Sequence, residues 1–140
     1  MRENNEDIYE IIENKLGLTE SQIDTLFEQN KFLNNVIAGD IIQEIRFFEG
    51  FGITRAELAK ISLKNPWILT ESFERVRYIE KFLKLVDITD IRWMAVNHPV
   101  SMSVNPITIK EFIEKNRNDG KTDEDIRNLI INDFEKYFKV

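Results

Sequence analysis

Apolar residues along this chain recur at spacings of three and four, and they never alternate over the length of a strand. This spacing places apolar side chains on one face of a helix and therefore predicts α-helices throughout. We expect longer helices over roughly 35–49, 71–85 and 123–138, with a leading helix near 6–16. The predicted buried stripes of the first two are Val36, Ile37, Ile41, Ile45 and Phe48, then Phe73, Val76, Ile79, Phe82 and Leu83.

A short motif repeats between these helices at steps of 35, 35 and 33 residues. Its copies are Gly17-Leu18-Thr19, Gly52-Ile53-Thr54, Asp87-Ile88-Thr89 and Gly120-Lys121-Thr122. A Thr can cap a helix N-terminus, with Gln22, Glu57 or Asp125 three residues later completing a capping box. A Gly two residues earlier suits the left-handed end of the preceding helix. The third copy has Asp87 for Gly and Arg92 at the box position, so this junction should be less regular.

Repeats of this length are typical of helical arrays, in which each unit buries its core against its neighbours. We therefore predict an all-α fold, a right-handed-type, α-solenoid-like array of about three and a half helical hairpin repeats with roughly eight short helices. The whole chain, 1–140, would form one domain. Its repeat units are about 16–50, 51–85, 86–118 and 119–140, preceded by an N-terminal capping helix at 6–16.

Prolines punctuate the repeats, because the residue before Pro resists helical geometry. Asn65-Pro66-Trp67-Ile68-Leu69 and His98-Pro99 should form compact turns, and Trp67 should fill the space between consecutive repeats. Asn105-Pro106, with a box of Thr108 and Glu111, should open another helix. Trp93 lies off the repeated apolar face, so we expect it to be exposed.

The segment from Phe51-Gly52-Ile53-Thr54 through Asn65-Pro66-Trp67-Ile68-Leu69 to Phe82-Leu83 resembles the repeat of the mitochondrial transcription termination factor (mTERF) family. Leu16-Gly17-Leu18-Thr19 matches its start again, but Asn30-Lys31 lacks the Pro, and His98-Pro99 lacks the Asn. The resemblance implies a curved solenoid of short helices whose concave basic face follows double-stranded nucleic acid, and it implies no enzymatic activity.

Charge is distributed unevenly along the chain, whose net charge is −6. Residues 1–50 carry 4 basic and 11 acidic groups, residues 51–85 carry 7 and 4, and residues 86–140 carry 8 and 10. Cysteine is absent, the first seven residues are polar and acidic, and no apolar run approaches the roughly 20 residues that span a bilayer. We expect a cytoplasmic protein with no membrane segment.

Candidate chemistry is sparse. Gly120-Lys121-Thr122 resembles the tail of a phosphate-binding loop, but Lys115 stands where that loop needs Gly, so a capped turn explains it better. The acidic run 123–125 suits a helix N-terminus rather than a calcium loop. His98 is the single histidine and should be a packing or solvent residue. We therefore expect no catalytic, cofactor or metal site, no enzyme, and no small-molecule ligand.

Two functions stay open. The small size, acidic surface and repeat scaffold favour a non-catalytic protein-binding module, an adaptor, inhibitor or immunity-type protein, with another protein as its partner. The alternative is a nucleic-acid-binding regulatory protein that uses the basic face of the middle repeat. The candidate partner-binding residues are Lys60, Lys64, Arg75, Arg77, Lys81, Lys84 and Trp93.

Overall fold

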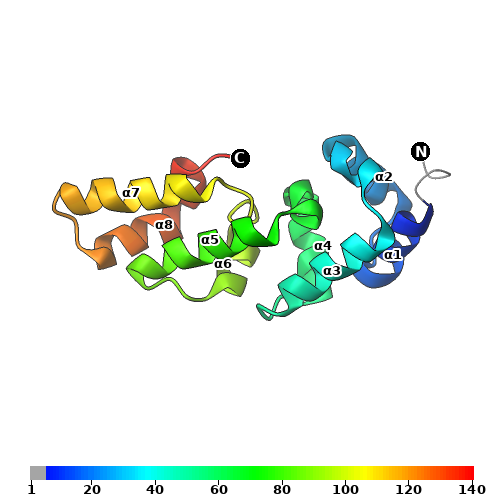
Figure 1. The fold of residues 1–140 in the computed structure, drawn as a ribbon, viewed down its shortest axis with the longest axis horizontal. Coiled ribbons are helices and arrows are strands. Elements are labelled where there is room, and N and C mark those ends of the chain that lie inside the picture. Colours follow the sequence, from blue (N-terminus) through cyan, green and yellow to red (C-terminus); the bar gives the residue numbers. More distant parts are fainter. Residues whose placement is uncertain (1–5) are drawn as a thin grey trace. The chain divides into compact units, whose positions relative to one another are not determined.

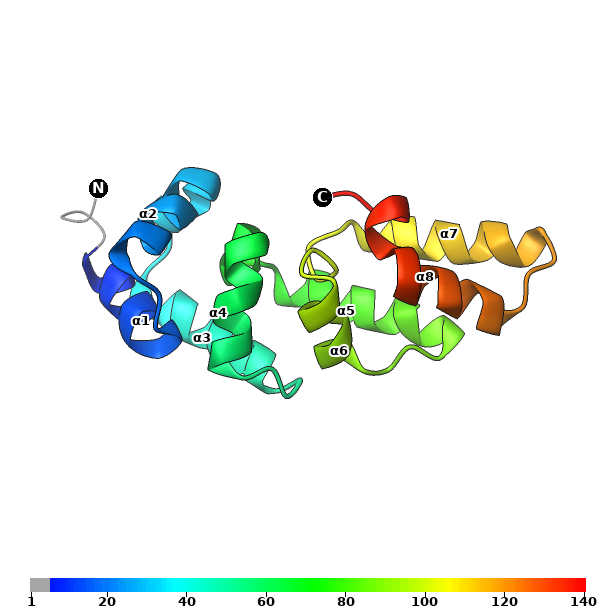
Figure 2. The same cartoon turned by 180° about the vertical axis from the view of Figure 1, so that it is seen from behind.

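The computed structural model describes residues 6–140, which are all-helical and contain no strand (Figures 1 and 2). The predicted fold class is confirmed. The α-helices are α1 (Glu6–Leu16), α2 (Glu20–Gln29), α3 (Ala38–Glu49), α4 (Arg55–Lys64), α5 (Phe73–Leu83), α6 (Ile91–Asn97), α7 (Pro106–Asn118) and α8 (Asp123–Tyr137). Three short 3-10 helices connect them: η2 (Lys31–Asn35), η3 (Pro66–Thr70) and η4 (Lys84–Val86).

The chain divides into two compact units, the first ending at Glu71 and the second running from Ser72 to Val140. In unit 1, α1 packs against α2, α3 and α4, and η3 packs on α3 and α4. The fully buried aromatic rings of Tyr9 and Phe27 stack with their centroids 5.1 Å apart. The Tyr9 hydroxyl donates a hydrogen bond to Asp24. Helices α1 and α2 are therefore joined by both apolar packing and a polar contact.

In unit 2, α7 packs against both α5 and α8. Buried aliphatic residues from these helices fill the space between them, including Val76, Ile79, Ile109, Ile113, Ile126 and Ile130. An aromatic cluster closes one end of the unit, where Phe112 lies 4.8 Å from Tyr137 and Phe134 lies 4.7 Å from Phe138, measured between ring centroids. The apolar face of α8 is thus covered along its length.

The repeated threonines begin helices as predicted. Thr19, Thr54 and Thr122 each form a complete capping box with the residue three positions later. The preceding glycines, Gly17, Gly52 and Gly120, have φ of +70°, +84° and +88°, a backbone conformation that only Gly adopts readily.

The third junction is irregular, also as predicted. Asp87 takes the left-handed conformation with φ of 61°. The cap of α6 is Asp90, whose Oδ1 accepts a 2.9 Å hydrogen bond from the backbone N–H of Trp93. Thr89 has no capping role, because the helix begins one residue further along the chain than in the other copies.

This difference predicts unequal effects of one substitution. Thr54→Ala should lower the free energy of unfolding by about 1 kcal/mol, because the Glu57 amide loses its hydrogen bond. The matched variant Thr89→Ala removes no cap and should change stability by no more than about 0.5 kcal/mol. Urea unfolding followed by circular dichroism measures both, and equal effects would contradict the capping assignment.

Several details of the sequence prediction are wrong. Phe73, predicted on the buried stripe, is 38% exposed at the first position of α5. Helix α7 begins at Pro106 and is capped by Asn105, not by Thr108, because Asn105 Oδ1 already accepts from the Ile107 amide at 3.1 Å. Ile37 is 70% exposed, since it lies in extended backbone before α3 rather than on its stripe. Trp67 is 38% exposed, because η3 buries Ile68 and Leu69 in its place.

The residue that ends a short helix also reaches the next repeat. Asn30, at the end of α2, is fully buried and donates to the Pro66 carbonyl at 3.0 Å and to Thr70 Oγ1 at 2.9 Å. His98 occupies the corresponding position at the end of α6. Its ring nitrogens contact the Ile131 carbonyl at 2.6 Å and the Glu135 carboxylate at 2.7 Å. Both residues therefore connect one repeat to the next by polar contacts.

Candidate functional site

Helix α5 and the first residue of η4 expose a basic stripe that includes three of the predicted residues. Arg77, Lys81 and Lys84 follow one another at spacings of four and three, which places them on one side of a helical path. All three are exposed, and Tyr78 beside them is 44% exposed. The Lys81 ammonium lies 5.9 Å from the Tyr78 ring centroid. We call these four residues the α5 basic face.

Helix α7 extends this basic character. Lys110 Nζ lies 5.9 Å from the ring centroid of Phe82 on α5, and it is also 3.9 Å from Glu114. Arg77 pairs with Glu80 at 3.1 Å, but both side chains are largely exposed, and such surface pairs are weak and open easily to a competing anion. The arrangement of cations beside aromatic rings suits phosphate groups and bases.

The remaining predicted residues lie elsewhere. Arg75 points to a different side of α5, and its Nη1 donates to the Ser103 carbonyl at 3.4 Å, so it fastens a neighbouring loop. Lys60 and Lys64 are exposed one turn apart on α4, which belongs to unit 1. The boundary between the units thus falls inside the predicted middle repeat.

Trp93 lies in an acidic setting. It is 38% exposed, as predicted, and lines a hollow of about 190 Å³ with Asp87, Asp90 and Ile131. The two carboxylates would repel phosphate. The indole also packs at the edge of His98, with ring centroids 5.7 Å apart. Trp93 is therefore not part of the α5 basic face.

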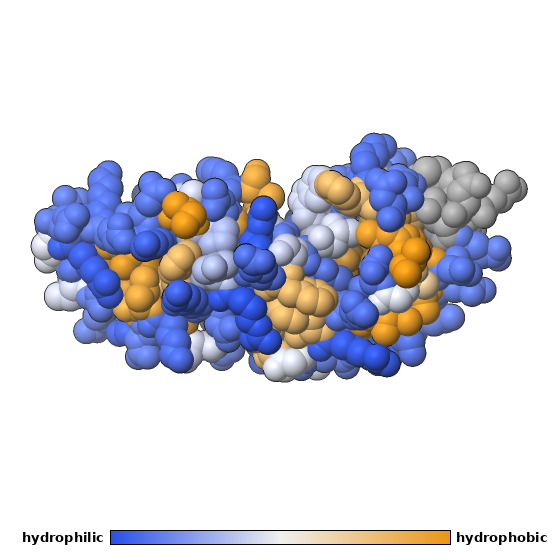
Figure 3. Space-filling model, in the orientation of Figure 1, coloured by the Kyte–Doolittle hydropathy of each residue, from blue (hydrophilic) through white to orange (hydrophobic). Residues whose placement is uncertain are grey.

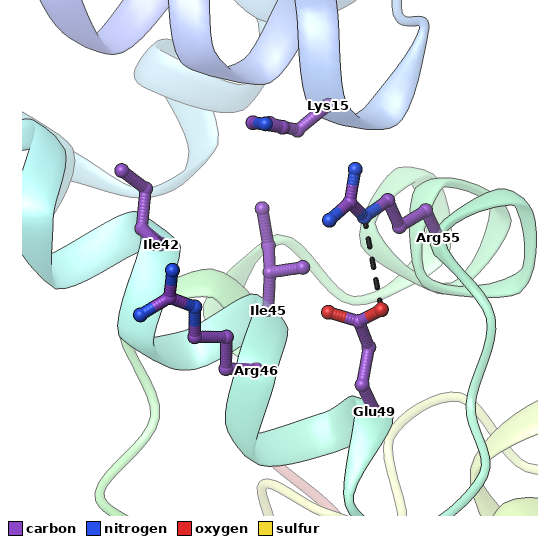
Figure 4. A pocket seen from close by; sticks show the side chains of 6 residues that line it. All are labelled: Lys15, Ile42, Ile45, Arg46, Glu49 and Arg55. Carbon is purple, nitrogen blue, oxygen red and sulfur yellow. Dashed lines mark ion pairs between the residues drawn. The ribbon is translucent and has the colours of Figure 1, made fainter.

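Unit 1 contains a cationic hollow that the sequence reasoning missed. Lys15 from α1, Arg46 from α3 and Arg55 from α4 line a space of about 100 Å³ (Figure 4). Ile42, Ile45 and Glu49 complete the lining. The Arg55 Nε lies 3.7 Å from Glu49 Oε2. The strongly acidic total for residues 1–50 concealed this site, although Lys15 and Arg46 are two of only 4 basic residues in that segment.

One carboxyl group in unit 1 is buried beneath the surface. Glu44 on α3 is only 7% exposed, and its Oε2 has no hydrogen-bond partner among the described residues. Burial, together with the nearby charges of Glu71 and Asp40, raises the pKa of Glu44 to about 9. The group is therefore protonated at neutral pH and offers no negative charge.

The segment that resembles a phosphate loop is a capped turn, as predicted. Lys121 Nζ donates to Asn116 Oδ1 at 2.8 Å, and Thr122 caps α8. The Arg117 guanidinium donates two hydrogen bonds to Asp123 and lowers the pKa of that carboxyl. The described residues contain no cluster of three metal-ligating side chains.

The surface around these sites is mostly hydrophilic, with separate apolar patches on each unit (Figure 3). Within residues 6–140, every helix is too short or too polar to cross a membrane.

A family model described as mTERF matches residues 2–136, nearly the whole chain. Comparison with curated proteins and with solved structures gives no match.

Proposed function

The chain belongs to the mTERF family, and from that premise we propose that it is a non-catalytic regulatory protein that binds nucleic acid. The resemblance described above implies phosphate contacts along a basic face, and the α5 basic face supplies the groups for such contacts. Arg77, Lys81 and Lys84 would bind phosphates, while the exposed Tyr78 ring offers a surface for stacking. This combination of three cations with an exposed aromatic ring is the observation that carries the proposal.

The chemistry of this face indicates binding with little sequence preference. Lys and Arg side chains on phosphates position a protein on a strand without reading its bases. The overall charge of −6 opposes association at long range, so the local basic face must overcome it. We therefore expect moderate affinity with a strong dependence on salt.

The protein-binding module favoured by the acidic surface stays a prediction, and membership of the mTERF family favours the nucleic-acid alternative. The cytoplasmic location likewise stays a prediction. Absence of enzymatic activity is part of the present proposal.

Neutralising the α5 basic face should weaken binding. The triple variant Arg77→Gln, Lys81→Gln, Lys84→Gln should lose about tenfold or more in affinity for short DNA and RNA duplexes, measured by fluorescence anisotropy at low salt. The slope of log affinity against log salt should become shallower by roughly 2–3, because each lost phosphate contact removes about 0.9.

A matched control separates a local effect from net charge. Lys115→Gln, Lys136→Gln, Lys139→Gln removes three exposed cations from the same unit and should leave most of the affinity intact. Equal losses in both triple variants would refute a role for the α5 basic face. Absence of duplex binding at micromolar protein and low salt would refute the proposed function itself.

A further inference from the structure

We propose that the cationic hollow of unit 1, lined by Lys15, Arg46 and Arg55, holds a single phosphomonoester group, and that on nucleic acid this group is the terminal phosphate of a strand. The second part rests on the proposed function. The first part concerns the hollow alone and depends only on its geometry and charge.

Three cations from three separate helices line one small space, and in Figure 4 the Arg46 guanidinium lies beside Ile42 and that of Arg55 beside Glu49, with Ile45 between them. Helices α1, α3 and α4 all pack on one another, so the backbone positions from which these side chains extend are fixed relative to each other. Lys15 and Arg46 form no ion pair or side-chain hydrogen bond within residues 6–140. An anion in this space would be attracted by all three cations.

Helix dipoles alone do not account for the arrangement. Lys15 and Arg46 lie in the last turns of their helices, where the dipole favours a cation. Arg55 is the first residue of α4, where the dipole opposes a cation. Its exposed pair with Glu49, in which Nε lies 3.7 Å from Oε2, offsets part of that effect.

The charge of the hollow fits a phosphomonoester better than the phosphodiester of a strand interior. Three cations and the Glu49 carboxylate leave a net charge of +2 on the lining. A phosphomonoester carries about −1.5 to −2 at neutral pH, whereas a phosphodiester carries a single negative charge. The two guanidinium groups can each present paired donors to phosphate oxygens.

The size of the hollow also restricts the ligand. Its volume of about 100 Å³ is well below the range of roughly 300–1,000 Å³ that accommodates cofactors and drug-sized molecules. One small anionic group fits, while the remainder of its molecule must lie outside. Ile42 and the buried Ile45 make part of the lining apolar, which strengthens attraction between the cations and an anion.

The test compares two strands of identical sequence, one with a 5′-phosphate and one with a 5′-hydroxyl. We expect the wild-type protein to bind the phosphorylated strand about tenfold more tightly, as for the gain of charge-assisted hydrogen bonds. The double variant Lys15→Gln, Arg46→Gln should lose this preference. The control Lys31→Gln, an exposed cation of the same unit outside the hollow, should keep it. The triple variant Arg77→Gln, Lys81→Gln, Lys84→Gln should bind both strands more weakly and still prefer the phosphorylated strand.

A second arm makes the site testable even if no strand binds. Adenosine 5′-monophosphate is titrated while the amide resonances of residues 15, 46 and 55 are followed by NMR, with adenosine as the control. Shifts that require the phosphate and vanish in the double variant support the phosphomonoester site with a free ligand as its source. Absence of both the strand preference and these shifts overturns the proposal, and a thermal unfolding curve of the double variant verifies that it folds.

Discussion

Glu44→Gln is expected to stabilise unit 1 by about 2 kcal/mol at pH 7. The folded protein holds a proton on Glu44 up to pH of about 9, whereas an unfolded carboxyl releases it near 4.5. Because of this difference, the free energy of unfolding falls by about 1.36 kcal/mol for each pH unit above 4.5. At pH 7 the loss is about 3 kcal/mol. Gln keeps the neutral shape, but a buried amide N–H without a partner costs roughly 1 kcal/mol.

The sign of the pH dependence follows from the raised pKa. Stability contributed by protonated Glu44 is complete below pH 4.5 and is lost as the pH rises toward about 9. The wild-type protein should therefore weaken steadily between pH 5 and 8.5 relative to the variant. Near pH 5 the two proteins should be almost equal in stability, and the advantage of the variant should grow above pH 7.

Urea unfolding at pH 5, 7 and 8.5 measures this difference. Trp67 lies in the same unit and reports its unfolding by fluorescence, in a Trp93→Phe background that removes the other indole. The control Glu28→Gln changes an exposed carboxyl on α2 and should shift stability by less than about 0.5 kcal/mol at every pH. A constant offset between Glu44→Gln and wild type across this range would show that Glu44 does not titrate with a raised pKa.

The pattern of α3 contained a signal for the burial of Glu44. Position 44 falls three residues after Ile41 and four before Phe48, on the stripe that these residues define. Sequence reasoning passed over it because a carboxylate is rarely placed in a core without a partner. Glu44 can be buried because it is protonated, and its protonation depends on packing against neighbouring elements. The residues around position 44 in the sequence do not predict that packing.

The sequence predicted a helix N-terminus correctly where a side-chain cap fixes it. The boxes at Thr19, Thr54 and Thr122 involve residues three positions apart, so their partners can be read directly from the sequence. The cationic hollow is the opposite case. Lys15, Arg46 and Arg55 come from three helices, and only tertiary packing brings them to one space. The net charge of residues 1–50 is strongly negative, so it gives no indication of a local cluster of cations.

The third repeat shows how a departure from a motif can keep its role. His98-Pro99 lacks the Asn of Asn65-Pro66, yet His98 is buried and bonded to the next repeat much as Asn30 is. The expectation of a packing residue is therefore correct, and its polar contacts are what the sequence could not show. Those contacts are made to α8, which is kinked at Asp133, between the two residues that His98 contacts.

His98→Ala is accordingly expected to lower the free energy of unfolding of unit 2 by about 3 kcal/mol. The change removes two hydrogen bonds, leaves the Ile131 carbonyl without its side-chain donor, and opens a cavity between Trp93 and Phe134. Urea unfolding at pH 6, followed through Trp93 in a Trp67→Phe background, measures the loss.

Glu135→Gln separates the two contacts of the ring. It keeps a side-chain acceptor and the Ile131 bond, and Glu135 is about half exposed, so the cost should be only about 1 kcal/mol. A His98→Ala variant no less stable than Glu135→Gln would mean that the contact with the α8 backbone contributes nothing. A clear difference would show that the packing of the His98 ring and its bond to the Ile131 carbonyl together stabilise unit 2. His98 would then join two repeats from the end of a short helix, as Asn30 does in unit 1.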